Sequence, residues 1–121
     1  MNKKFLCFLT SLIVFIILVG CKTEKYGSPI NKNVPTIKIK EIMLNKSSIG
    51  QTVNLEGIII TQCQSKGCWF FLKDDTGQIF INLAPANISI PPKTGKKAIV
   101  TGEVAFENGN FFIIARGLEI R

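Results

Sequence analysis

Five short runs rich in β-branched and aromatic residues occupy residues 53–120 and constrain the fold more than any other feature of the chain. Turn-forming Gly, Asn and Asp residues separate several of these runs, and this spacing is typical of hairpins. Gly57 and Gly102 fall inside two of the runs, where glycine indicates a bulge or a tight bend, as at a barrel corner. The pattern predicts an all-β domain with strands over residues 53–62, 69–74, 78–83, 97–106 and 111–120.

The connections between these runs indicate how the strands are arranged. Residues 84–95 contain three prolines and predict an irregular crossover with room for at most one short helix. Residues 37–44 fit either a lead-in strand or one helical turn. Five strands with the long connection between the third and the fourth are the layout of an OB-fold, a Greek-key barrel. We therefore expect a five-stranded OB-fold barrel over residues 36–121.

Several motifs within residues 36–121 carry a family resemblance. They are Val53-x-Leu55-x-Gly57, Phe71-Leu72-x-Asp74-x-Thr76-Gly77-x-Ile79 and Gly95-x-x-Ala98-x-Val100-x-Gly102. With them the chain resembles bacterial OB-fold proteins of the nucleic-acid-binding and periplasmic kinds. Gly67-Cys68-Trp69 is similar to a motif of small exported OB-fold families of unknown function. The resemblance implies a fold, and a fold alone does not define an activity.

The N-terminal residues have the features of an export signal. Lys3 and Lys4 precede fifteen uncharged, mostly apolar residues, 5–19, which is typical of a secretory signal peptide. A retained anchor helix is the alternative, but a membrane span needs about 20 apolar residues. Leu18-Val19-Gly20-Cys21 resembles the bacterial lipoprotein box, which implies cleavage before Cys21 and lipid on its thiol. We therefore expect a protein anchored to the cell membrane or outer membrane by Cys21, facing the periplasm or the exterior.

Residues 21–35 predict a lipidated, flexible tether, because Gly, Ser, Pro and Asn punctuate them without apolar periodicity. Loss of the signal, residues 1–20, removes two of the 15 basic residues and none of the 8 acidic ones, which leaves a formal charge of +5. A charge of this size bears on solubility and loose partners rather than on fold. The lipid bilayer is the first partner that the sequence predicts.

Alternation along the second and third predicted strands separates an inner face from an outer one. Phe70, Leu72, Ile79, Ile81 and Leu83 are expected inside the barrel. The outer set is Trp69, Phe71, Lys73, Gln78, Phe80 and Asn82. OB-folds usually bind ligands on these strands, so the outer set predicts a ligand-binding face. The alternative is that the tether or the crossover covers the rings as a second small core.

The ligand expected for this face is an envelope protein or a glycan. Single-stranded nucleic acid is also compatible with the fold, the charge and the aromatic side chains, which can stack on bases. An exported compartment argues against it. The sequence therefore favours a non-enzymatic binding module and leaves nucleic-acid binding as an alternative.

The cysteines divide into two pairs. Cys7 leaves with the signal and Cys21 takes the lipid, so Cys63 and Cys68 remain in the domain. They flank a predicted four-residue loop, and residues that flank such a loop face each other at a distance that a disulfide can bridge. An exported compartment permits this bond, so we predict a structural disulfide. The alternative is a thiol site for redox exchange or for a soft ion such as copper(I).

Nothing in the sequence predicts an enzyme. The chain contains no histidine, the commonest general base, and a zinc site would need other ligands. Asp74 and Asp75 fit turn chemistry, and no phosphate-binding Gly-rich loop precedes a helix. We therefore expect no catalytic residues, no bound metal and no cofactor.

Overall fold

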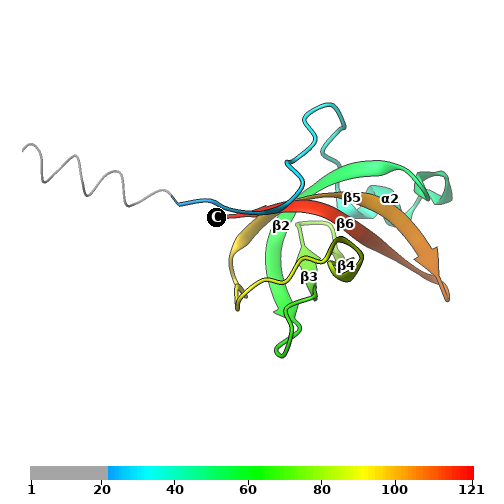
Figure 1. The fold of residues 1–121 in the computed structure, drawn as a ribbon. Coiled ribbons are helices and arrows are strands. Elements are labelled where there is room, and N and C mark those ends of the chain that lie inside the picture. Colours follow the sequence, from blue (N-terminus) through cyan, green and yellow to red (C-terminus); the bar gives the residue numbers. More distant parts are fainter. Residues whose placement is uncertain (1–21) are drawn as a thin grey trace, which may run out of the picture.

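Strands β2 to β6 close into a barrel in the computed structural model, which describes residues 22–121 (Figure 1). They are β2 (Thr52–Gln62), β3 (Trp69–Lys73), β4 (Gln78–Asn82), β5 (Lys97–Glu107) and β6 (Asn110–Ile120). Each strand ends within one residue of the run that predicted it. The predicted all-β, five-stranded barrel is confirmed.

The pairing of the strands is that of an OB-fold. β2, β3 and β4 are antiparallel neighbours, β5 pairs with both β2 and β6, and β6 runs parallel to β4. This last pair is the long-range contact that closes the Greek-key barrel. Gly102 of β5 lies at a register shift, as predicted for a glycine inside a strand. Gly57 of β2 permits a close approach instead, since a Cβ there would collide with the carbonyl oxygen of Lys73.

The barrel interior is filled by apolar side chains from all five strands. The five residues predicted inside are each at most 2% exposed: Phe70, Leu72, Ile79, Ile81 and Leu83. Their chain neighbours on β3 and β4 are half-buried or exposed. The inward and outward side chains predicted for β3 and β4 are therefore those that the structure shows.

Residues 37–44 resolve as a helical turn rather than a strand. Helix α2 (Ile39–Met43) places Ile39 and Ile42 in the barrel core, where they are 1% and 0% exposed. The beginning of α2 is fixed to the β3–β4 turn, because the Ile39 N–H donates to Asp74 Oδ2 over 2.9 Å. A short 3₁₀ turn, η1 (Lys46–Ser48), leads from α2 towards β2.

The crossover between β4 and β5 contains one 3₁₀ turn, η2 (Ala84–Ala86), as expected from its prolines. Beyond η2, Ile88 and Ile90 are buried in the core. The Ile90 N–H donates to the carbonyl of Gly67 over 3.1 Å, so the crossover lies against the β2–β3 loop.

The segment predicted as a tether differs most from expectation. It forms β1 (Glu24–Gly27), which pairs antiparallel with the end of β6, Glu24 lying opposite Ile120 (Figure 1). Further along, the Asn31 N–H donates to Thr101 Oγ1 over 3.0 Å, and its carbonyl accepts from Asn54 Nδ2 over 2.8 Å. Residues 22–35 are therefore attached to the barrel. β6 extends past β4, and its exposed edge offers main-chain partners that no local pattern in residues 22–35 reveals.

The predicted signal peptide and Cys21 lie outside the described residues. Within residues 22–121, no helix is long and apolar enough to cross a membrane.

Candidate functional site

The six residues predicted to form a binding face lie together on the outer side of β3 and β4. Trp69 lies opposite Asn82, Phe71 opposite Phe80, and Lys73 opposite Gln78. Directly opposed residues of two strands project to the same side of the sheet, where their side chains interact. These six residues are called the aromatic face below.

The three rings of the aromatic face contact one another. The Phe71 and Phe80 centroids are 5.4 Å apart, those of Trp69 and Phe80 are 5.6 Å apart, and those of Trp69 and Phe71 are 6.1 Å apart. Two of the pairs are edge-to-face, an arrangement worth about 0.5–1.5 kcal/mol beyond the area that it buries. All three rings are half-buried. The cluster is therefore stabilised from within and still presents apolar surface to solvent.

The polar residues of the aromatic face differ in how exposed they are and in whether they already have a partner. Lys73 and Gln78 are exposed, and Lys73 takes part in none of the ion pairs formed within residues 22–121. Asn82 is half-buried, and its Oδ1 accepts the Ala84 N–H over 3.2 Å. Lys73 therefore supplies an unneutralised positive charge beside the rings.

Strand β6 extends this face in a way that the sequence analysis missed. Through the parallel pairing, Phe80 lies beside Phe112 and Asn82 beside Ile114. A hollow of about 660 Å³ opens here, and α2 contributes Met43 to its wall alongside Phe71 and Phe80. Alternation in β6 places Phe112 and Ile114 outward, but only the β4–β6 pairing brings them to the predicted site.

Neither segment suggested as a cover buries the rings. β1 follows the far part of β6, beside residues 117–120, and the crossover directs Ile88 and Ile90 into the core. Trp69, Phe71 and Phe80 keep contact with solvent. Within residues 22–121 this surface is therefore not covered by another segment.

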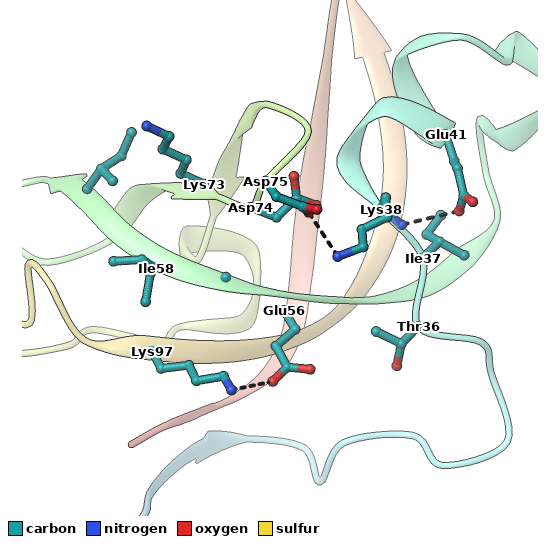
Figure 2. Close-up of a pocket in the computed structure, with 12 residues that line it drawn as sticks. Thr36, Ile37, Lys38, Glu41, Glu56, Ile58, Lys73, Asp74, Asp75 and Lys97 are labelled. Atoms are coloured by element: carbon teal, nitrogen blue, oxygen red, sulfur yellow. Dashed lines mark hydrogen bonds and ion pairs between the residues drawn. The ribbon is translucent and has the colours of Figure 1, made fainter.

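A second hollow, of about 710 Å³, lies between the beginning of α2 and the outer side of β2 (Figure 2). Two ion pairs line it, Lys38 Nζ with Asp75 Oδ1 and Lys97 Nζ with Glu56 Oε1, each at 2.9 Å. The Lys73 amine points away from Asp75 (Figure 2). Lys73, Glu41 and Asp74 also line this hollow but lie outside these two ion pairs, and apolar atoms make up most of its wall.

Asp74, at the edge of the same hollow, has a structural role in holding the β3–β4 turn against α2. Its carboxylate accepts the N–H groups of Ile39, Thr76 and Gly77 and the Thr76 hydroxyl. Burial raises the pKa of Asp74, but these hydrogen bonds, led by the one from the Thr76 side chain, outweigh it and hold the pKa below its usual value. The hydrogen bond and the charge of Lys38 likewise lower the pKa of Asp75. Both carboxylates therefore stay ionised and hydrogen-bonded.

Cys63 and Cys68 are free thiols in the structure, and they do not face each other. Before a bulge in β2, Ile58 lies opposite Lys73; after it, Thr61 lies opposite Phe71. An unbroken register would place Cys63 opposite Cys68, but the bulge shifts the pairing by one residue. The Cys63 N–H therefore donates to the carbonyl of Trp69 over 3.1 Å. The cross-hairpin geometry assumed for a structural disulfide is absent, and the oxidation state of the two thiols stays a prediction.

The surroundings of Cys63 favour its thiolate. The Ser65 hydroxyl lies 3.5 Å from the sulfur, and backbone N–H groups of Lys66, Ser65 and Cys68 are also hydrogen-bonded to it. These contacts, the Ser65 hydroxyl first, lower the pKa of the Cys63 thiol to about 6. Residues 22–121 contain no group of three or more His, Cys, Asp or Glu side chains placed to hold a metal ion.

Comparison with known proteins identifies the fold and no more. No family model matches the chain, and no curated protein matches it in sequence. The structure is similar to that of the hypothetical protein ygiW from E. coli, at 15% identity and a TM-score of 0.54, covering 79% of this chain and 97% of ygiW. It is also similar to part of a Leishmania major Friedlin protein named as an aspartyl-tRNA synthetase, at 12% identity and a TM-score of 0.59, covering 78% of this chain and 22% of that one. Both likenesses support the OB-fold barrel.

Proposed function

We propose that this protein is a non-enzymatic binding module of the cell envelope, anchored through lipid on Cys21, that binds an envelope protein or a glycan with its aromatic face. The observation that carries the proposal is the cluster of three mutually contacting, half-exposed rings on the β3–β4 surface. Exposed apolar patches on monomers often mark interaction sites, and these strands are where OB-folds usually bind.

The chemistry around the rings supports a ligand with both flat and polar parts. The rings offer apolar surface for a sugar ring or an apolar side chain, and aromatic residues are enriched in protein interfaces. Gln78 and Lys73 add exposed donors at one end of the face, and the hollow beside Phe112 offers a recess at the other side. An anionic group on the ligand would pair with Lys73, with a salt-dependent gain in affinity.

The attachment of β1 bears on how the module would be held. Only Lys22 and Thr23 separate Cys21 from β1, so a lipid on Cys21 would keep the barrel close to the bilayer. Lys93 pairs with Glu24 over 2.8 Å and Lys97 with Glu56 over 2.9 Å, so the basic residues beside β1 that lie outside the ion pairs formed within residues 22–121 are Lys22, Lys25 and Arg121. Basic residues at a bilayer surface are attracted to anionic headgroups. They would help to hold the module in one orientation.

Crosslinking in membranes tests the binding face. Wild-type protein, Phe80→Ala and the control Phe106→Ala are photo-crosslinked in envelope membranes, and the adducts are quantified. Phe106 is an aromatic residue at the β5–β6 hairpin that is 38% exposed and lies outside the aromatic face. We expect adducts to be lost in Phe80→Ala and kept in Phe106→Ala. Equal adducts in all three proteins would show that the face does not bind.

Fluorescence of Trp69 tests the ligand class. Trp69 is the only tryptophan, so its emission reports directly on the aromatic face. We expect cell-wall muropeptides or a crosslinked envelope protein to change this emission. A change caused by a single-stranded oligonucleotide, suppressed by salt as for other nucleic-acid contacts, would replace the proposed ligand with nucleic acid.

A further inference from the structure

The β2–β3 loop is shaped around the sulfur of Cys63. Gly67 adopts a left-handed conformation, φ +59°, and its N–H donates to the carbonyl of Cys63 over 3.2 Å. A Cβ at Gly67 would collide with the carbonyl oxygen of Ile90, so the loop packs directly on the crossover. The Ser89 hydroxyl, also from the crossover, donates to the carbonyl of Lys66. These contacts fix the loop in one shape.

In that shape, donors converge on one atom. The Ser65 hydroxyl lies 3.5 Å from the sulfur of Cys63, and hydrogen bonds from the backbone of Lys66, Ser65 and Cys68 also lower the pKa of this thiol. Successive backbone N–H groups turned towards one point form a nest that stabilises negative charge. Cys63 is half-buried, so its sulfur also keeps a path to solvent. The loop therefore holds an accessible thiolate.

A small recess lies beside this sulfur, and the backbone of Cys68 lies close to it. Cys63 lines a hollow of about 380 Å³ together with Pro91 and Pro92 of the crossover, which is within the size range of small-molecule sites. The backbone N–H of Cys68 is one of the groups hydrogen-bonded to the Cys63 sulfur, so the second cysteine lies at the same end of the β2–β3 hairpin. The β2 bulge places Cys63 opposite Trp69, one residue away from Cys68, so a bond between the two sulfurs would need the loop to adjust. Disulfides that depart from relaxed geometry are the more easily reduced ones.

We propose that Cys63 and Cys68 form a thiol–disulfide exchange site for a small-molecule disulfide, with Cys63 as the nucleophile and Cys68 as the resolving thiol. A dithiol whose disulfide is strained suits a cycle of oxidation and reduction rather than a permanent crosslink. This role is separate from ligand binding by the aromatic face.

The exchange balances in two steps. The Cys63 thiolate attacks one sulfur of the disulfide RS–SR, a Cys63–SR bond forms, and RS⁻ leaves. Cys68 then loses its proton to solvent and attacks the Cys63 sulfur, which forms the Cys63–Cys68 disulfide and releases the second RS⁻. The protein dithiol is oxidised by two electrons and the small disulfide is reduced to two thiolates.

Titration of the reduced, full-length mature protein with 5,5′-dithiobis(2-nitrobenzoate) tests this assignment, with intact mass as the readout. We expect the wild type to release two thionitrobenzoate anions per chain and to keep no adduct, and Cys68→Ser to keep one adduct on Cys63. An oxidised wild type should be reduced by equimolar dithiothreitol under native conditions. Cystine in place of the reagent should give the same protein disulfide. Circular dichroism shows whether each variant is folded. The intact mass also reports any lipid on Cys21, because the lipid adds a mass different from that of a thionitrobenzoate adduct.

The pH dependence of alkylation tests independently whether the groups hydrogen-bonded to the Cys63 sulfur lower its pKa. In Cys68→Ser, the rate of iodoacetamide modification at Cys63 should rise about 11-fold from pH 5 to pH 8, since the Cys63 pKa is about 6. A cysteine with an ordinary pKa of about 8.5 would show a rise of about 800-fold. Ser65→Ala should make the alkylation rate depend on pH more steeply, as it does for a cysteine with an ordinary pKa. An ordinary profile in the unaltered loop, adducts retained on both cysteines, or a disulfide that resists dithiothreitol would overturn the proposal.

Discussion

Truncation of Phe80 measures how the aromatic face is built. The Phe80 ring contacts the rings of Phe71 and Trp69 at 5.4 and 5.6 Å between centroids, and it is half-buried. Each such pair is worth about 0.5–1.5 kcal/mol, so Phe80→Ala should lower the free energy of unfolding by about 1–3 kcal/mol. Phe70, its matched control, is 0% exposed in the barrel core, and Phe70→Ala should cost about 3–5 kcal/mol.

Urea unfolding followed by far-ultraviolet circular dichroism compares the two variants, because this signal does not depend on the altered surroundings of Trp69. The critical result is whether Phe80→Ala loses less unfolding free energy than Phe70→Ala. A loss in Phe80→Ala as large as that in Phe70→Ala would show that the rings are buried structure and would remove the basis for a binding face. A loss below about 0.5 kcal/mol, typical of isolated surface positions, would show that the rings do not support one another.

Three further predictions concern the anchor, the β3–β4 turn and the segment before the barrel. Cys21→Ser should abolish lipid labelling and leave an uncleaved precursor in a pulse-chase experiment; normal maturation would refute the lipoprotein assignment. The pKa of Asp74 is lowered in the folded protein, so its contribution to stability is present above its unfolded pKa, about 3.9, and is lost as the pH falls through the folded value. Asp74→Asn should therefore flatten the loss of stability below about pH 4 in acid titrations, and an unchanged titration would contradict this. Residues 36–121 should retain a β-type circular dichroism spectrum but unfold at lower urea concentration than residues 22–121, because Asn54 and Thr101 lose their hydrogen bonds to Asn31; equal midpoints would show that the docked segment adds no stability.

Local patterns in the sequence were sufficient for the barrel strands and for the two faces of β3 and β4. Side chains alternate with a period of two along a strand, so the apolar set at Phe70, Leu72, Ile79 and Ile81 had to lie inside. The same periodicity placed Trp69, Phe71 and Phe80 outside. Turn-forming glycine and asparagine residues marked the ends of several strands. These features depend only on residues close together in the chain, which is why the sequence reveals them.

The remaining features depend on contacts between distant segments. Phe112 joins the aromatic face only because β6 runs parallel to β4, and Met43 reaches its edge only through the packing of α2. β1 forms on the edge of β6, which supplies the hydrogen-bonding partners that residues 24–27 cannot supply to one another.

The bulge in β2 gives the sharpest example of the difference. It shifts the pairing by one residue, so that Cys63 lies opposite Trp69 rather than Cys68, and the loop then turns its N–H groups towards the Cys63 sulfur. The sequence by itself determined which residues form the strands, the core and the outward rings, because periodicity acts along the chain. Only the tertiary structure decided the register of the two cysteines and the partners of the rings, because a one-residue shift between strands leaves every local pattern unchanged.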